Sequence, residues 1–435
     1  MHYRPLRAIG FIAAVFATIS VLAQEFSVQP DRESGIYKAG ETVKWTIEVK
    51  GEAAAVAALQ SPTYQIKSGG LNVSRQGPLQ LTDGKTTIEA QSAEAGWLLL
   101  DVSAKDAQGK DIRAFGGAIF SPEQIKPSSA CPDDFDAFWR AKLQELSKVP
   151  ADAALQEDQS GRDGVKYYSI TMNNIRGTHI RGQLARPARE GKFPAMLIVQ
   201  WAGVYSLQKS WVTDRAADGW LVLNIQAHDL PALESDEFFK QQGEGPLKNY
   251  PGIGNDDRET SYFLRMYLSC YRAAEYLTTR DDWDGKVLVV TGGSQGGLQS
   301  IVTAALNPKI TAALANVPAG CDNTGPDANR APGWPGWITW SRAGKDLAKV
   351  KQASRYYDVV NFAARVKCSV LVGTGGVDTT CPPVGVFAMY NQIAAPKEIV
   401  FMPLAGHGGR FHGKYNIRDD AWTSAAKAGG QLPPK

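Results

Sequence analysis

The fold is decided by the stretch Val287-Leu288-Val289-Val290-Thr291-Gly292-Gly293-Ser294-Gln295-Gly296-Gly297. Its first five residues predict a buried strand, and a helical run from Leu298 to Leu306 follows the glycines. A serine between glycines at a turn from strand to helix is the Gly-x-Ser-x-Gly pattern of a nucleophile elbow. The glycines let strand and helix approach closely, and the turn exposes the Ser294 hydroxyl. The pattern alone also fits an ordinary glycine-rich turn. Whether Ser294 is a nucleophile therefore depends on the other residues that such a serine needs.

A serine nucleophile needs two donors for the oxyanion that develops when it attacks a carbonyl group. The elbow places the backbone N–H of Gln295 at the start of the helix, where it can serve as the first donor. The second donor is expected in the loop after an early strand. Met196 to Gln200 is that strand, and we predict the backbone N–H of Val204, in the loop Trp201 to Tyr205, as the donor.

The serine also needs a base, and the base needs an orienting acid. Two histidines follow Ser294, namely His407 and His412. His407 lies in a loop directly after a predicted strand, where α/β sheets bind their ligands, and it is therefore preferred over His412. Asp378 is the first carboxylate after the preceding strand and is predicted as the acid, although it could instead cap the next helix.

The region around the elbow alternates apolar strands with helical patterns. Such strands imply a mostly parallel sheet with helices on both faces, which is the α/β class. The predicted strands are Ala195 to Val199, Trp220 to Ile225, Val287 to Thr291, Ile310 to Val317, Ser369 to Gly373 and Glu398 to Met402. Helical patterns include Ser261 to Leu277 and Tyr356 to Val366.

The sequence before this region has a different pattern of apolar and polar residues. Short alternating segments such as Thr42 to Val49 and Gly96 to Val102 are separated by glycine turns. This spacing predicts an immunoglobulin-like β-sandwich over residues 24–125. The stretch Lys126 to Ser129 reads as a linker, and the α/β domain is expected over residues 131–435.

The first residues resemble an export signal. Arg4 and Arg7 precede an apolar run that ends in the small residue Ala23. A secretory signal peptide over residues 1–23 is preferred over a membrane anchor, because the run is short and interrupted by polar residues. The protein is therefore expected to be exported, to the periplasm or the extracellular space, without stable insertion in a membrane.

Composition narrows the function further. The net charge of +3 is spread along the chain without a basic block, which gives no reason to expect a nucleic-acid partner. The five cysteines form no metal-binding spacing, and their pairing cannot be read from the sequence. No cofactor and no metal are predicted, and the oligomeric state stays open.

These residues together resemble the acetyl xylan esterase / cephalosporin C deacetylase family. The resemblance rests on Ser294-Gln295-Gly296-Gly297, Asp378-Thr379-Thr380-Cys381-Pro382-Pro383, Phe387-Ala388-Met389-Tyr390-Asn391 and Gly406-His407. It implies the α/β-hydrolase fold and a serine esterase that releases acetate from acetylated carbohydrates, xylan above all. It also implies a triad of Ser294, Asp378 and His407, with the N–H groups of Gln295 and Val204 as oxyanion hole.

The sequence departs from the family at Gln226-Ala227-His228-Asp229, where relatives usually carry Asp-x-Arg-Gly, and at Gly408, where an acidic residue is common. His228 either faces the site or has a structural role. Trp201, Trp334 and Trp337 are candidate sugar contacts, and the alternative for the last two, as for Trp340, is packing onto the core. Two other functions stay open: a serine peptidase of the prolyl-oligopeptidase type and a non-catalytic glycan-binding protein.

Overall fold

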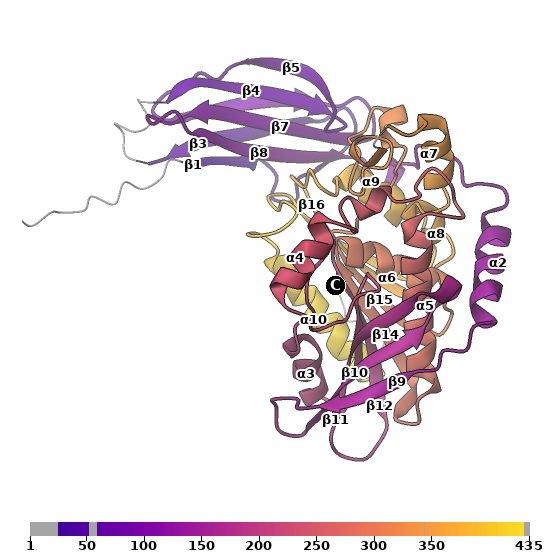
Figure 1. The fold of residues 1–435 in the computed structure, drawn as a ribbon. Coiled ribbons are helices and arrows are strands. Elements are labelled where there is room, and N and C mark those ends of the chain that lie inside the picture. The colour runs from indigo at the N-terminus through magenta and orange to yellow at the C-terminus, as the bar shows by residue number, and fades with distance from the viewer. Residues whose placement is uncertain (1–24, 52–58, 343, 430–435) are drawn as a thin grey trace, which may run out of the picture.

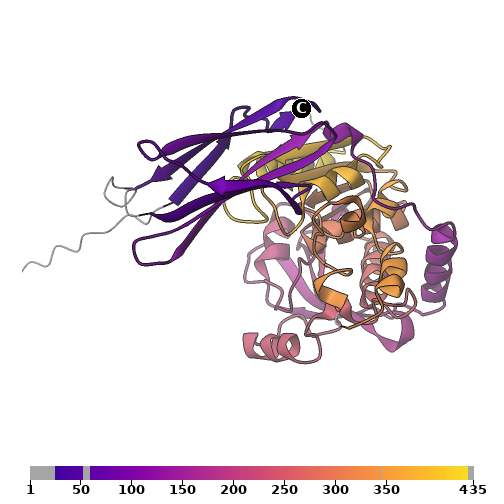
Figure 2. The ribbon, with the colours of Figure 1, turned by 90° about the horizontal axis from the view of Figure 1, so that it is seen from above.

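The computed structural model describes residues 25–51, 59–342 and 344–429. The predicted signal peptide, residues 1–23, lies outside the described residues. Two parts are visible in Figure 1, where the N-terminal strands lie above a larger α/β part. Figure 2 shows from above that the strands of the first part extend sideways beyond the second.

The N-terminal part consists of two sheets that enclose a common apolar core. The smaller sheet has the order β1-β3-β6 and the larger one the order β2-β8-β7-β4-β5. Val43, Trp45 and Ile47 of β3 are fully buried, as their alternation predicts. The strands are β1 (Glu25–Pro30), β2 (Ile36–Tyr37), β3 (Thr42–Lys50), β4 (Gln60–Ser68), β5 (Asn72–Pro78), β6 (Lys85–Gln91), β7 (Gly96–Lys105) and β8 (Asp111–Phe120).

The α/β part is built on a nine-stranded sheet with the order β17-β16-β15-β14-β12-β13-β11-β10-β9. Strands β12 to β17 run parallel to one another, and β9 to β11 add an antiparallel edge. The strands are β9 (Ala154–Asp158), β10 (Val165–Asn173), β11 (His179–Pro187), β12 (Phe193–Val199), β13 (Leu221–Ile225), β14 (Trp283–Gly293), β15 (Ala312–Asn316), β16 (Ser369–Gly375) and β17 (Lys397–Met402).

Helices cover both faces of this sheet, so the parallel strands are apolar on both sides. Within β14, Leu288 and Val290 belong to the core under α5 and α6, whereas Val287 and Val289 belong to the core under α3 and α10. The helices are α2 (Phe135–Ser147), α3 (Ser210–Ala217), α4 (Asp236–Glu244), α5 (Tyr262–Thr279), α6 (Gln295–Leu306), α7 (Leu347–Ser354), α8 (Val359–Ala363), α9 (Pro383–Tyr390) and α10 (Gly413–Lys427). Short 3-10 turns lie at Pro122–Gln124, Ile175–Gly177, Tyr250–Gly252, Gly325–Ala328 and Trp340–Arg342.

The six strands predicted for the α/β part are present with small shifts at their ends, and the helix predicted over Tyr356 to Val366 is shortened to α8. The sequence analysis missed β9, β10 and β11. Strand β9 is exposed along its whole length, and β10 and β11 carry charged and polar residues on their outer face. The edge strand β9 needs no apolar run, and the interior strands β10 and β11 mix buried apolar residues with polar ones, so a search for continuous apolar runs detects none of the three.

The two parts are joined by direct packing as well as by the chain. The indole N–H of Trp97 on β7 donates a hydrogen bond to the carbonyl oxygen of Gly376, which lies just after β16, at 2.9 Å. Trp97 also belongs to a small apolar cluster that includes Val384 and Phe387 of α9. The predicted linker is tied down too, because Ser128 donates its backbone N–H to Asp322 at 2.7 Å. The N-terminal sheets are therefore packed against the loop that follows β16.

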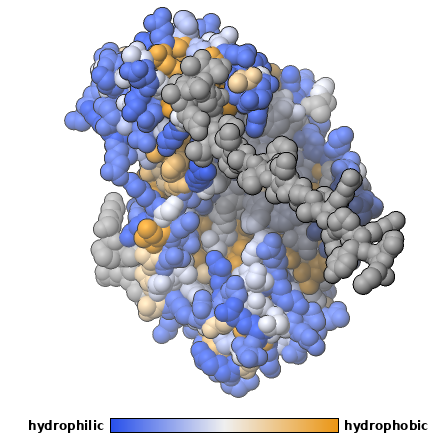
Figure 3. All heavy atoms as spheres, turned by 90° about the vertical axis from the view of Figure 1, so that its left-hand side faces the viewer, coloured by the Kyte–Doolittle hydropathy of each residue, from blue (hydrophilic) through white to orange (hydrophobic). Residues whose placement is uncertain are grey.

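The surface is mostly polar on the side drawn in Figure 3, where apolar residues form only small separate groups. In the described part of the chain, no helix combines the length and the apolar character that a membrane-spanning segment needs.

The contact between the two parts predicts the effect of a single methyl group. A Cβ atom on Gly117 would lie 1.9 Å from the carbonyl oxygen of Gly376, whereas a Cβ on Gly96 would meet nothing within 4 Å. We expect Gly117→Ala to lower the free energy of unfolding by about 1–3 kcal/mol. Gly96→Ala, the matched control, should change it by less than about 0.5 kcal/mol. Urea unfolding of both variants measures the difference, and equal stability would show that the contact is not made.

Candidate active site

The strand-to-helix turn predicted around Ser294 is present between β14 and α6. Ser294 has φ 58° and ψ −120°, a strained conformation for a residue with a side chain. Its backbone N–H donates to the carbonyl oxygen of Asn316 at 2.9 Å, which holds the turn against β15. A Cβ atom at Gly296 would lie 2.6 Å from the carbonyl oxygen of Val199. The glycine pattern is thus required by the close approach of α6 to the end of β12.

His407 and Asp378 reach Ser294 from the two loops that follow β17 and β16. The Nε2 atom of His407 lies 2.9 Å from the Ser294 hydroxyl oxygen, and its Nδ1 atom lies 2.9 Å from Oδ2 of Asp378. A carboxylate only accepts hydrogen bonds, so Nδ1 carries the proton and Nε2 accepts from the serine hydroxyl. This is the arrangement in which an imidazole can remove the proton from serine.

Asp378 is fully buried, and its second oxygen is also fixed. Oδ1 accepts hydrogen bonds from the backbone N–H groups of Thr380 and Cys381, both at 2.8 Å. Oδ2 therefore points at His407. Asp378 does not cap α9, which begins at Pro383 after Pro382 and has no side-chain cap. Its hydrogen bonds to Thr380 and Cys381 form a local turn instead, and the same geometry aims its other oxygen at the imidazole.

His412, the other histidine considered from the sequence, does not reach Ser294. Its Nε2 atom lies 3.1 Å from the carbonyl oxygen of Gly406, the residue before His407. His412 therefore contacts the loop that carries His407, and His407 is the histidine that contacts the serine.

The two predicted backbone donors lie on either side of a shared hydrogen-bond network. Gln295 is the first residue of α6, so its N–H has no acceptor within the helix. The fully buried Gln295 side chain accepts from the Tyr250 hydroxyl at 2.6 Å. The same hydroxyl accepts from the N–H of Gly203, next to Val204, at 3.3 Å. Tyr250 was not identified from the sequence, because no motif marks it and only the fold brings it to this loop.

Several aromatic residues lie in or next to the loop that carries Val204. Trp201 is 48% exposed and stacks on Tyr205, with ring centroids 5.1 Å apart. A cavity of about 520 Å³ is lined by Val204, Tyr250, Trp334 and Trp340, among others, and not by Trp201. Trp340 is 56% exposed.

The prediction that Trp337 contacts a sugar disagrees with the structure. Trp337 is 1% exposed, and its ring packs against Phe263 and Tyr357 in the core. Glycines and prolines around it suggested an open loop, but the loop folds back over α5. Trp340, three residues later, occupies the exposed position instead.

The described residues include one set of side chains near the serine that could hold a metal ion. Asp378, Cys381 and His407 each offer a ligand atom, and these atoms lie within 4.8 Å of one another. Burial raises the pKa of the Cys381 thiol well above its usual range, so the sulfur is held as a neutral thiol and is a poor ligand. A metal would also displace the hydrogen bond between Asp378 and His407.

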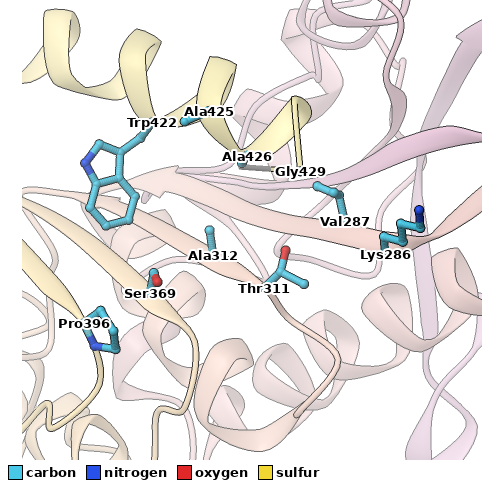
Figure 4. Close-up of a pocket in the computed structure, with 10 residues that line it drawn as sticks. All are labelled: Lys286, Val287, Thr311, Ala312, Ser369, Pro396, Trp422, Ala425, Ala426 and Gly429. Carbon is cyan, nitrogen blue, oxygen red and sulfur yellow. The ribbon is translucent and has the colours of Figure 1, made fainter. Parts of the chain in front are cut away.

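A larger cavity, about 580 Å³, lies away from this site (Figure 4). It is lined by Val287 in the first half of β14, by Thr311 and Ser369 next to or at the starts of β15 and β16, and by Trp422 of α10. Ser294, Asp378 and His407 lie at the opposite, carboxyl ends of the parallel strands. The cavity therefore belongs to the other edge of the sheet and not to the candidate active site.

Comparison with known proteins identifies the family. Residues 122–418 match the family model described as Acetyl xylan esterase (AXE1). The chain is 34% identical over 388 residues to the acetyl esterase Axe7A of Xylanibacter ruminicola, covering 87% of this chain and 85% of that protein.

Two solved structures each match 68% of this chain. An acetyl xylan esterase from a Paenibacillus species matches with a TM-score of 0.59 and 25% identity, over 68% of this chain and 97% of that one. Acetyl xylan esterase 1 from a Thermoanaerobacterium species matches with a TM-score of 0.58 and 25% identity, over 68% and 96%. The chain therefore belongs to the acetyl xylan esterase family of carboxylic ester hydrolases.

Proposed function

We propose that this protein removes acetyl groups from acetylated carbohydrates, with xylan or xylo-oligosaccharides as the preferred substrates, through an acetyl-enzyme intermediate on Ser294. The observation that carries the proposal is the hydrogen-bonded chain from Asp378 through His407 to Ser294. Family membership supports the choice of an acetyl ester over a peptide bond, and of catalysis over simple glycan binding.

The proposed reaction begins when the Ser294 hydroxyl oxygen attacks the acetyl carbonyl carbon and its proton passes to Nε2 of His407. The buried Asp378 carboxylate stabilises the imidazolium that forms, and the N–H groups of Gln295 and Val204 stabilise the oxyanion. His407 then returns the proton to the departing sugar hydroxyl, which leaves Ser294 acetylated. Water, activated by the same imidazole, attacks the acetyl group and releases acetate with regeneration of the serine. No step requires a metal or a cofactor.

We propose that aromatic residues near the loop Trp201 to Tyr205, here called the oxyanion loop, contact the sugar of the substrate. Trp340 and Trp334 line the cavity beside Val204, and Trp201, in the same loop as Val204, is 48% exposed. Indole rings have flat apolar faces of the kind that pack against sugar rings. We also propose that residues 24–125 form an immunoglobulin-like domain ahead of a catalytic domain over residues 131–435, and that residues 1–23 direct export.

The first test is the loss of the nucleophile. We expect Ser294→Ala to reduce kcat for acetate release from acetylated xylo-oligosaccharides by about 10⁶-fold, because nothing else in the site can form the acetyl-enzyme. Its thermal stability should match that of the wild type, which controls for folding. Activity within tenfold of the wild type would contradict the proposal. Wild-type assays on acetylated xylan, mannan and pectin, and on a peptide, test the substrate class.

The second test separates the two histidines and the acid. In Asp378→Asn, the remaining oxygen should stay on the N–H groups of Thr380 and Cys381, and the amide group would then face Nδ1 of His407. The imidazole would carry its proton on Nε2 and could not accept from Ser294, at an expected cost of about 10⁴-fold in kcat.

His407→Ala should cost at least as much as Asp378→Asn, because it removes the base itself. His412→Ala, its matched control, should cost less than about tenfold, because it loses only the contact with Gly406. The measurement is kcat of each variant on one acetylated substrate. A severe loss in His412→Ala together with a mild loss in His407→Ala would show that the base is misassigned.

The third test concerns recognition of the sugar. Stacking of an aromatic ring contributes about 0.5–1.5 kcal/mol, so we expect Trp340→Ala to raise KM for an acetylated xylo-oligosaccharide about three- to tenfold. KM for a small aryl acetate should not change. Ile417→Ala, at an exposed residue of α10, is the control for loss of surface area. Equal effects on both substrates would place Trp340 outside the sugar subsite.

A further inference from the structure

His228 lies in the segment after β13 and is the most buried histidine near the oxyanion loop, with 1% of its surface exposed. Both ring nitrogens have partners. Nε2 lies 2.9 Å from the carbonyl oxygen of Gly203, and Nδ1 lies 2.7 Å from the hydroxyl oxygen of Tyr262. A buried ring with both nitrogens engaged has one fixed orientation.

The partners also determine which nitrogen of His228 carries the proton. A carbonyl oxygen only accepts, so Nε2 must donate to Gly203. Arg265 donates to the Tyr262 oxygen at 2.8 Å, which leaves the Tyr262 hydrogen free to be donated to Nδ1. Burial lowers the pKa of His228 to about 4, so the ring is neutral near pH 7. His228 is thus a neutral donor aimed at one carbonyl group.

That carbonyl group shares a peptide unit with the predicted oxyanion donor. The Gly203 carbonyl and the Val204 N–H belong to one planar peptide, and in the described residues the only cis bond lies elsewhere, at Trp334-Pro335. In a trans peptide the carbonyl and the N–H point in opposite directions. Holding the carbonyl with His228 therefore aims the Val204 N–H away from His228. This N–H has no protein acceptor within the part of the chain that the structure describes.

The preceding peptide unit, Ala202-Gly203, is held by Tyr250. Gly203 has φ 128°, a conformation that residues with a Cβ rarely adopt. Its N–H donates to Tyr250, whose hydroxyl donates to the side chain of Gln295, the residue with the other predicted donor. His228 and Tyr250 rings are in contact, with centroids 4.7 Å apart. One network therefore fixes the loop relative to α6.

We propose that His228 is a positioning residue for the oxyanion hole. Its Nε2–H fixes the Gly203-Val204 peptide so that the Val204 N–H faces the oxyanion on the Ser294 adduct. The inference rests on the proposed serine mechanism and adds to it a residue at the position where this sequence departs from the family pattern.

The test compares His228→Leu, which cannot donate, with His228→Gln, whose amide nitrogen can reach the Gly203 carbonyl. Loss of one oxyanion donor costs about 10²–10³-fold in kcat. A misaimed donor is expected to cost about 10–100-fold in His228→Leu, with KM for a small aryl acetate changed less than twofold. The kcat of His228→Gln should be at least tenfold higher than that of His228→Leu. Tyr262→Phe removes the hydroxyl that fixes the tautomer of His228, and its kcat should lie between those of the wild type and His228→Leu.

A tetrahedral adduct separates positioning from general damage to the fold. Methylboronic acid binds a serine nucleophile as a tetrahedral adduct, and its Ki should rise in His228→Leu by the same factor as kcat/KM falls. His179→Leu is the matched control, because His179 is a half-exposed histidine that contacts the neighbouring Asp229. It should leave kcat and Ki unchanged.

Three outcomes would overturn the inference. They are kcat within twofold of the wild type in His228→Leu, an unchanged boronate Ki despite a lower kcat, and a failure of His228→Gln to recover activity when His228→Leu is soluble and folded. If His228→Leu does not fold, Tyr262→Phe and His228→Gln decide the question by the same two measurements. Failure of the serine mechanism itself would appear separately, as activity in Ser294→Ala.

Discussion

The close approach of α6 to the end of β12 is the constraint on which the rest of the site depends. The turn at Ser294 is strained, and it persists because β12 and β15 hold it from two sides. Gly292 and Gly296 both pass within van der Waals distance of the Val199 backbone, where a Cβ atom would lie 2.8 and 2.6 Å from the Val199 oxygen. The strain is thus offset by packing of the parallel sheet, and it results in an exposed hydroxyl at the carboxyl edge of the strands.

Everything else in the site approaches this fixed point from a neighbouring loop. Asp378 and His407 come from adjacent parallel strands, β16 and β17, so their loops meet at the same edge of the sheet. The loop Trp201 to Tyr205, which carries the proposed oxyanion donor, follows β12, and β12 pairs with β14 on the side away from β15. The order of strands in the sheet therefore brings together Ser294 and His407, which are 113 positions apart in the chain.

The N-terminal sheets add a second level of support. Trp97 donates to Gly376, two residues before Asp378, and Gly117 packs against the same peptide. Their effect on the acid is indirect, because they contact the loop and not the carboxylate. The loop that carries Asp378 lies between β16 and α9 in the chain, and the N-terminal sheets pack against it. This packing limits how far the loop can move.

The sequence alone determined the apolar parallel strands, the glycine elbow and the order of serine, aspartate and histidine, because each leaves a local pattern in the residues. Tertiary structure alone decided what depends on contacts between distant segments. Strand β9 is exposed, and β10 and β11 mix buried residues with polar ones, so none of the three carries a continuous apolar run. Trp337 is buried while Trp340 is exposed, although both lie in one Gly/Pro-rich loop. Tyr250, His228 and Trp97 form hydrogen bonds with backbone groups in other segments of the chain. A hydrogen bond to a backbone N–H or carbonyl group imposes no residue pattern on the segment that contains that group.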